Sequence, residues 1–187
     1  MIINYPLGFK NLEDNEKEIN YKSRGMSFES RINKTNDYYT RNKIASIIKR
    51  PTPIKVISVD ESTKLITKAV FLEDSTTDYN GIFQGHYIDF EAKSTTNKTS
   101  FPLSNLEEHQ YEHLKLVDEM NGISFLLIEF SKLDEIYLLP FKKLEAFIKN
   151  NKRHSLPLNY LKNNAFKINT TIQAYVDYLE CVLKNLI

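Results

Sequence analysis

Two acidic residues and a lysine are spaced in this chain so that they could cleave phosphodiester bonds. Asp78 is followed 13 residues later by Glu91, and Lys93 lies two positions beyond Glu91. Residues 86–93 alternate in polarity, and successive side chains of a strand point to opposite faces, so we expect Asp89, Glu91 and Lys93 to share one face. Two carboxylates can hold a hard divalent cation through oxygen, and a nearby lysine can reach what that cation binds.

The spacing Asp-x(n)-Glu-x-Lys is typical of PD-(D/E)xK nucleases, although an acid followed two residues later by lysine also occurs by chance. Longer stretches agree with the nuclease interpretation. The chain resembles the RecU family of Holliday junction resolvases at residues 24–29, 49–53, 75–82, 85–93, 97–103 and 109–110. Thr77 replaces the proline that gives the superfamily its name, which is usual for RecU-like sequences. The resemblance spans nearly the whole chain from Arg24 onward.

This resemblance implies a fold, a metal and a substrate. The fold would be α/β, with a mixed central sheet flanked by helices as in restriction endonucleases and a projecting β-hairpin stalk at about residues 54–72. The activity would be that of a Mg²⁺-dependent endonuclease that resolves four-way (Holliday) DNA junctions by paired symmetric nicks during homologous recombination and DNA repair. The resemblance also implies a homodimer, and it suggests a recombinase and a branch-migration motor as protein partners.

The resemblance assigns four residues to the metal site: Thr76, Asp78, Glu91 and Gln110. The two acids would ligate Mg²⁺ directly, whereas the threonine and the glutamine would contact it by hydroxyl, amide or bound water. Lys93 would offset the charge that builds on the phosphate in the transition state. Glu29 is a further catalytic candidate, because related nucleases place a glutamate on the first helix. Asp89 would act from behind the metal ligands.

The elements that must position these residues follow from hydrophobic periodicity and turn signals. We expect the order α-β-β-β-α-β-β-α-α, without internal repeats. Gly81 and Gly85 should lie between strands. The expected elements are a helix at about 25–48 stopped by Pro51 and Pro53, strands at 54–59, 65–72 and around Glu91, a helix from a capping box of Ser104 and Glu107 to about Asn121, strands at 123–130 and 135–139, a short helix opened by Pro140, and a final helix at 172–187 capped by Thr171.

Gln110 is a polar residue on the helix face that should pack against the sheet. Leu106, Gln110, Leu114 and Val117 form one stripe at helical spacing. A buried amide without partners costs ~1–3 kcal/mol, so a structural hydrogen bond and a contact with the metal are both open from the residues alone. The nuclease motif favours the metal contact.

Length and composition are consistent with one soluble domain. The chain has 187 residues, of which 41% are hydrophobic, and we expect a mobile arm at 1–21 followed by a single nuclease domain at 22–187. No apolar run approaches the roughly 20 residues of a membrane span, and no signal peptide is evident, so we expect a cytoplasmic protein without membrane contact. The single cysteine, Cys181, cannot form an internal disulfide.

Positive charge is concentrated in one segment. The chain carries a net charge of +1, yet residues 22–55 hold nine basic and two acidic residues, a local excess of seven. A phosphate-contacting segment would show such an excess, because phosphate neutralisation supplies most non-specific affinity for nucleic acid. An ordinary solvated helix face is the alternative.

Other chemistries have less support. His109 and His113 are spaced to share a helix face and could hold zinc, but no third ligand follows at a useful spacing. No glycine-rich phosphate loop is present, so nucleotide hydrolysis is not indicated. Two alternatives to a junction resolvase stay open: a restriction-type or repair nuclease on the same fold, and a catalytically silent DNA-binding or structural module. The acid pair with Lys93 argues against the silent module.

Overall fold

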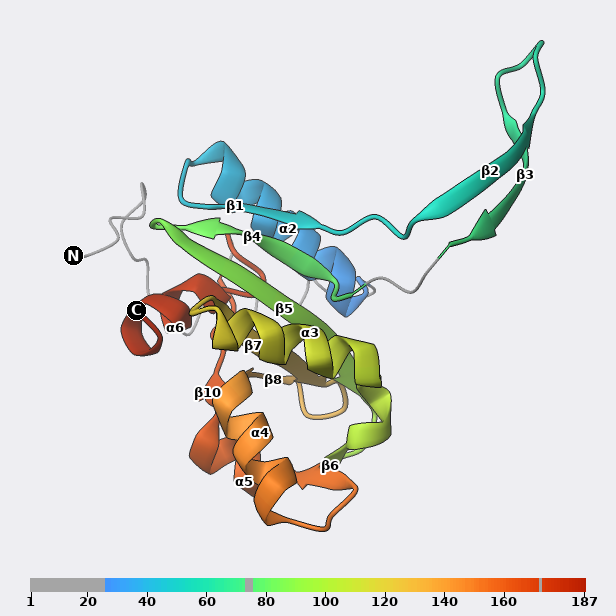
Figure 1. Ribbon diagram of the computed structural model, residues 1–187. Coiled ribbons are helices and arrows are strands. Elements are labelled where there is room, and N and C mark those ends of the chain that lie inside the picture. Colours follow the sequence, from blue (N-terminus) through green and yellow to red (C-terminus); the bar gives the residue numbers. More distant parts are fainter. Residues whose placement is uncertain (1–25, 73–75, 172) are drawn as a thin grey trace.

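The computed structural model describes residues 26–72, 76–171 and 173–187, and in this part of the chain the body is built around a six-stranded mixed sheet (Figure 1). The predicted arm at 1–21 lies outside the described residues. Neighbouring strands pair in antiparallel fashion except β5 and β7, which are parallel. In sheet order, the strands are β1 (Ser46–Lys49), β4 (Tyr79–Phe83), β5 (His86–Thr95), β7 (Ile123–Phe130), β8 (Glu135–Pro140) and β10 (Phe166–Lys167).

Helices pack on both faces of the sheet, as the mixed α/β prediction requires. On one face lie α2 (Phe28–Arg41) and α6 (Tyr178–Asn185), and on the other lie α3 (Glu108–Glu119), α4 (Phe141–Asn150) and α5 (Leu158–Asn164). A short ribbon of β6 (Ser100–Pro102) and β9 (Ser155–Pro157) joins the second group. All residues of β7 are buried, because its side chains alternate between the two cores.

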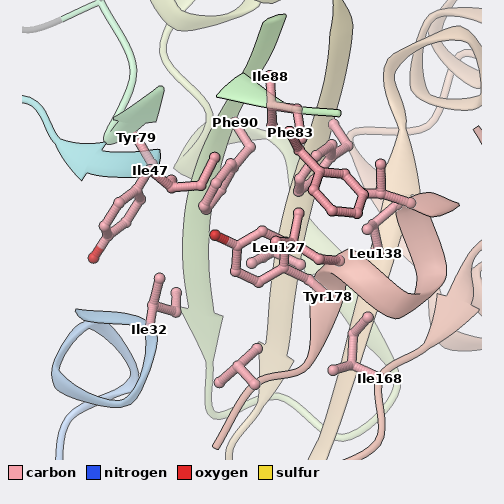
Figure 2. Close-up of a cluster of buried hydrophobic side chains, with 14 of the residues drawn as sticks. Ile32, Ile47, Tyr79, Phe83, Ile88, Phe90, Leu127, Leu138, Ile168 and Tyr178 are labelled. Carbon is pink, nitrogen blue, oxygen red and sulfur yellow. The ribbon is translucent and has the colours of Figure 1, made fainter. Parts of the chain in front are cut away.

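Stacked aromatic rings fix the register of the central strands (Figure 2). The ring centroids of Tyr79 and Phe90 are 4.9 Å apart and those of Phe90 and Phe125 are 4.8 Å apart, with nearly parallel planes. These residues are also cross-strand partners on β4, β5 and β7. Since Asp78 precedes Tyr79 and Glu91 follows Phe90, the aromatic stack holds the two candidate metal ligands at the same level of the sheet.

The predicted hairpin projects from the body as a separate stalk (Figure 1). Its strands are β2 (Ile54–Val59) and β3 (Ile66–Phe71), which pair in antiparallel fashion. At the tip, the carboxylate of Asp60 accepts hydrogen bonds from the backbone amides of Ser62 and Thr63, at 2.9 and 2.8 Å. Every residue from 51 to 72 is exposed, so the stalk presents both of its faces to the surroundings.

The first predicted helix was too long, and the prediction missed the helix α5 and five strands, β1, β4, β6, β9 and β10. α2 ends at Arg41, Lys43 adopts a left-handed conformation with φ of 55°, and the β-branched residues that follow form β1. Gly81 lies inside β4 and not between strands. A Cβ at Gly81 would stand 2.0 Å from the carbonyl oxygen of Ser46, so glycine is needed for β1 and β4 to approach.

Two helix starts also differ from the prediction. α3 begins at Glu108 and is capped by Glu107 and Gln110, because residues 103–105 form a 3-10 turn after Pro102. The last helix begins at Tyr178, since Thr171 caps a local turn by accepting a hydrogen bond from the amide of Ala174. No helix in the described ranges is long and apolar enough to cross a membrane.

Candidate active site

Asp78 and Glu91 lie side by side where β4 begins. Tyr79 pairs with Phe90, so Asp78 and Glu91 are the next residues along the two strands. The carboxylate of Glu91 accepts a hydrogen bond from the amide of Asp78 at 2.9 Å, and the carboxylate of Asp78 accepts one from the amide of Ala92 at 3.1 Å. Each acid is therefore held by the backbone of the strand that carries the other. The predicted acid pair is formed.

Glu91 is short of positive charge. It is 1% exposed, and burial, with the neighbouring charge of Asp78, raises its pKa to about 7. Lys93 opposes this shift, because its Nζ lies 2.8 Å from Oε1 of Glu91. Two carboxylates that share one site with a single ammonium group repel each other. A bound cation would relieve that repulsion, and a raised pKa of this origin is typical of functional sites.

The donor set fits Mg²⁺. This ion is commonly bound by one or two carboxylates and keeps several waters or substrate phosphate oxygens. In the described part of the chain, no group of three or more His, Cys, Asp or Glu residues is placed to hold a metal. The acid pair supplies the two carboxylates that Mg²⁺ commonly takes from a protein.

Gln110 contacts the acid pair through its nitrogen. Its Nε2 donates a hydrogen bond to Oε1 of Glu91 at 2.8 Å, and its Oε1 accepts one from the amide of Glu107 at 3.1 Å. Gln110 is buried together with Leu114 and Val117, as the helical stripe predicts. The structural hydrogen bond is present, so an oxygen contact with a metal would require the amide to leave the cap of α3.

Thr76 and Glu29 each contact a basic side chain. The hydroxyl of Thr76 accepts a hydrogen bond from the guanidinium of Arg50. The carboxylate of Glu29, in the first turn of α2, is half-exposed and lies 2.5 Å from Nζ of Lys49. Burial raises the pKa of Tyr79, and the charges of Glu29, Asp78 and Glu91 raise it further, which places Glu29 within electrostatic reach of the same ring. The roles of Thr76 and Glu29 stay predictions.

The two histidines of α3 have different partners. Nδ1 of His109 lies 3.5 Å from the carboxylate of Glu107, whereas Nε2 of His113 lies 3.0 Å from Oδ2 of Asp89. This arrangement does not favour a shared zinc ion. Asp89 is completely buried, and side chains that the sequence did not connect with it, Arg50 and Tyr87, also bond to it.

Different signals could have revealed these two residues. Tyr87 shares the alternating strand face of Asp89, so the period of the strand was a usable signal. Arg50 is 39 residues away from Asp89, because it precedes the stalk in the sequence and Asp89 follows the stalk. No local pattern connects the two residues.

Several basic side chains of the segment at 22–55 form ion pairs with acids of the protein itself. Arg31 is buried and forms an ion pair with Glu129, so the expectation that it contacts phosphate is wrong. Lys49 pairs with Glu29, and Arg50 pairs with Asp89. Lys22 and Arg24 lie outside the described residues. The other described basic residues of the segment, Lys34, Arg41, Lys43 and Lys55, are exposed, and Arg41 pairs with Asp37 on the surface; their contact with phosphate stays a prediction.

An acid pair on adjacent strands of a mixed sheet, followed by a lysine on the same face, is the arrangement typical of PD-(D/E)xK nucleases. Sequence comparison narrows that class. The chain belongs to the RecU family, since the family model for recombination protein U matches residues 23–184.

Curated relatives support the family assignment over nearly the full length. Holliday junction resolvase RecU of Streptococcus mutans is 44% identical over 194 residues, which cover 100% of this chain and 98% of that protein. Holliday junction resolvase RecU of Staphylococcus aureus strain JH9 is 46% identical over 172 residues, which cover 89% of this chain and 83% of that protein. Among solved structures, Hjc of Archaeoglobus fulgidus, a Holliday junction resolvase, has a TM-score of 0.43 at 10% identity and covers 70% of this chain and 90% of that chain.

Proposed function

We propose that this chain is a Mg²⁺-dependent endonuclease that cuts four-way DNA junctions, by paired symmetric nicks made by a homodimer. The observation that carries the proposal is the buried pair of Asp78 and Glu91 with Lys93 beside it. Its support from comparison is membership of the RecU family, with relatives named Holliday junction resolvases that match this chain along nearly its whole length. A recombinase and a branch-migration motor as partners stay predictions.

The residues around the acid pair have distinct tasks. Mg²⁺ held by Asp78 and Glu91, with Gln110 and Thr76 as further candidates, would supply Lewis-acid chemistry by acidifying a water and offsetting phosphate charge. The backbone hydrogen bonds fix the two carboxylates before substrate arrives. The side chain of Lys93 is 20% exposed, so its ammonium group can extend from Glu91 toward a bound phosphate and stabilise the charge that develops there.

Nicking of a synthetic mobile junction tests the proposal. The full chain should cut the junction with Mg²⁺ and leave it intact when EDTA replaces Mg²⁺. Denaturing gels with each strand labelled in turn should show cuts at symmetric positions in two opposite strands. A linear duplex that contains the same sequence is the control. Equal cutting of the duplex would favour the restriction-type or repair nuclease, and failure to cut either substrate would favour the silent module.

The stalk is the feature that favours a junction over a duplex. It is exposed along its whole length and stands clear of the body (Figure 1), so it can enter the open centre of a four-way junction, which a duplex does not have. Replacing residues 60–65 by Asn-Gly would close a shorter hairpin with a favourable turn and keep Val59 opposite Ile66. We expect the preference for junction over duplex to fall by about 10-fold, which is about 1.4 kcal/mol.

Anisotropy titrations with both DNA substrates measure this preference, and Asp60→Ala is the matched control because it perturbs the tip without shortening the stalk. An unchanged preference in the shortened protein would move junction recognition to the body.

Paired nicks require two active sites related by the symmetry of the junction, which a twofold dimer provides. An exposed apolar surface supports a second copy as the partner. Ile48 on β1, Ile82 on β4 and Tyr87 at the start of β5 share one face of the sheet, and they are 58, 58 and 41% exposed. β1 is followed in the chain by β2 of the stalk, whose apolar residues Ile54, Val56, Ile57 and Val59 are also exposed.

Analytical ultracentrifugation tests the dimer surface. Ile48→Lys combined with Ile82→Lys should convert the dimer to a monomer, because two charges would be buried in the contact. Leu65→Lys, at the exposed tip of the stalk, is the matched control and should stay dimeric. A double variant that still sediments as a dimer would place the contact elsewhere.

A further inference from the structure

A second buried carboxylate lies on the same face of β5 as Glu91 but has different surroundings. Asp89 has no exposed surface. Its oxygens accept hydrogen bonds from the hydroxyls of Thr77 and Tyr87 and from the guanidinium of Arg50, and they lie 3.0 Å from Nε2 of His113. These partners occupy the oxygens that a metal ligand would need to offer, so Asp89 is not placed to bind a cation itself.

The same cluster joins the two connections between stalk and body. Arg50 is the last residue before Pro51, where the chain leaves for the stalk, and Thr76 is the first described residue on the return side. The guanidinium of Arg50 donates to the hydroxyl of Thr76, and the amide of Arg50 donates to the carbonyl oxygen of Asp78 at 2.8 Å. Both connections are therefore fastened to each other and to β5 through Asp89.

Each element that supports the acid pair also contributes to this cluster. Thr77 directly precedes Asp78, and Asp89 lies two residues before Glu91 on β5. On α3, His113 lies near Asp89 and Gln110, one turn earlier, bonds to Glu91. A shift of the Asp89 cluster would thus be transmitted to Asp78, Glu91 and Gln110 by directly bonded neighbours.

We propose that Asp89 is a positioning residue that, with Arg50, sets the spacing of the acid pair for a divalent cation. The inference rests on the proposed function, because it assumes that Asp78 and Glu91 hold that cation. Groups that orient metal ligands from behind commonly change metal affinity by 10- to 100-fold when they are removed. Asp89→Asn keeps the shape of the side chain but removes the charge that attracts Arg50.

Mn²⁺ binding to the full chain without DNA, measured by electron paramagnetic resonance or calorimetry, tests the role of Asp89 apart from catalysis. Asp89→Asn should weaken Mn²⁺ binding by about 10-fold. The matched control is Glu129→Gln, because Glu129 is also a buried carboxylate that accepts from an arginine and a hydroxyl, Arg31 and Ser94. The affinity of the Glu129→Gln variant for Mn²⁺ should stay within about twofold of the wild-type affinity, which is within the spread of the measurement.

The outcomes separate this inference from the proposed function. Wild-type protein that does not bind Mn²⁺, or binds it equally well in Asp78→Asn, contradicts the proposed function. If Mn²⁺ binding depends on Asp78 but is unchanged in Asp89→Asn, or is weakened as much in Glu129→Gln, the positioning role is overturned. Tyr87→Phe removes two hydrogen bonds at a partly exposed position, one donated to Asp89 and one accepted from Arg50, so it carries the test if Asp89→Asn does not fold. A smaller loss of affinity supports the role, and no loss overturns it.

Discussion

Glu91 and Asp89 are buried carboxylates two residues apart on one face of β5, yet their surroundings are opposite in charge. Glu91 faces a second acid, Asp78, and a single ammonium group. Asp89 faces a guanidinium, two hydroxyls and an imidazole. Residue type, burial and strand position are nearly the same for both, so the partners decide what each acid does. Glu91 lacks enough positive charge around it, whereas the charge and the oxygens of Asp89 are already paired.

The difference arises from the elements that reach each of the two acids on β5. The connections to the stalk bring Arg50 and Thr77 to Asp89, whereas the start of β4 brings Asp78 to Glu91. α3 contributes to both, with His113 at one acid and Gln110 at the other. The candidate metal site and the Asp89 cluster are thus built from the same elements, by residues that are one or two positions apart in sequence or one helical turn apart.

The largest expected effect is at the acid pair. Asp78→Asn or Glu91→Gln should lower Mg²⁺-dependent junction cleavage by at least ~1000-fold, because losing a ligand charge removes several kcal/mol of metal-assisted stabilisation. Junction binding should stay within a few-fold of wild type, since the basic surface is unchanged. Nicking assays and anisotropy titrations measure the two quantities. Substantial Mg²⁺-dependent cleavage by either variant would remove the contrast between the two acids.

Lys93→Ala should have the next largest effect. The lysine is proposed to act mainly on charge that develops in the transition state, so the turnover rate should fall by ~100-fold while junction affinity changes little. Lys132→Ala, which removes an exposed lysine, controls for general loss of positive charge. If affinity falls as steeply as rate, Lys93 is a phosphate anchor and its catalytic role is contradicted.

Removing the charge of each acid should change stability in opposite directions. The pKa of Glu91 is raised to about 7 in the folded protein from an ordinary 4.5. The stability that comes from this shift is present in full below pH 4.5 and lost as pH rises through 7. At pH 8 without metal, Glu91→Gln should therefore stabilise the fold by about 2 kcal/mol, and at pH 4.5 it should have little effect.

Asp89→Asn should instead destabilise the fold by about 2 kcal/mol, because the guanidinium of Arg50 loses its buried partner. Thermal unfolding in EDTA at both pH values measures both variants. The contrast fails if the two substitutions shift the melting temperature at pH 8 in the same direction.

The acid pair was predictable from sequence, but the cluster of side chains around Asp89 was not. Asp78, Glu91, Lys93 and Gln110 come together as the strand period and the helical stripe predict. The α2 boundary was missed because the residues after Arg41 keep an apolar spacing that fits a helix or a strand, and only pairing with β4 decides between them. Arg50 and Asp89 stand on either side of the stalk in the sequence, so the bond between them depends on tertiary structure alone.

The smallest expected effect concerns the pH dependence of metal binding. A carboxylate must lose its proton to bind a cation, and the pKa of Glu91 is about 7 in the metal-free protein. The fraction of ionised Glu91 is about ten times lower at pH 6 than at pH 8, so Mn²⁺ affinity should be about 10-fold lower at pH 6. Calorimetry at both pH values should also show proton uptake by the buffer at pH 6, because binding displaces the proton of Glu91.

In Asp89→Asn the affinity should be lower at both pH values while the ratio between them stays near 10-fold, since Asp89 positions Glu91 without binding the cation. A ratio near one in the wild-type protein would show that Glu91 is ionised throughout this range, and it would end the distinction between an acid that lacks positive charge and an acid that is satisfied.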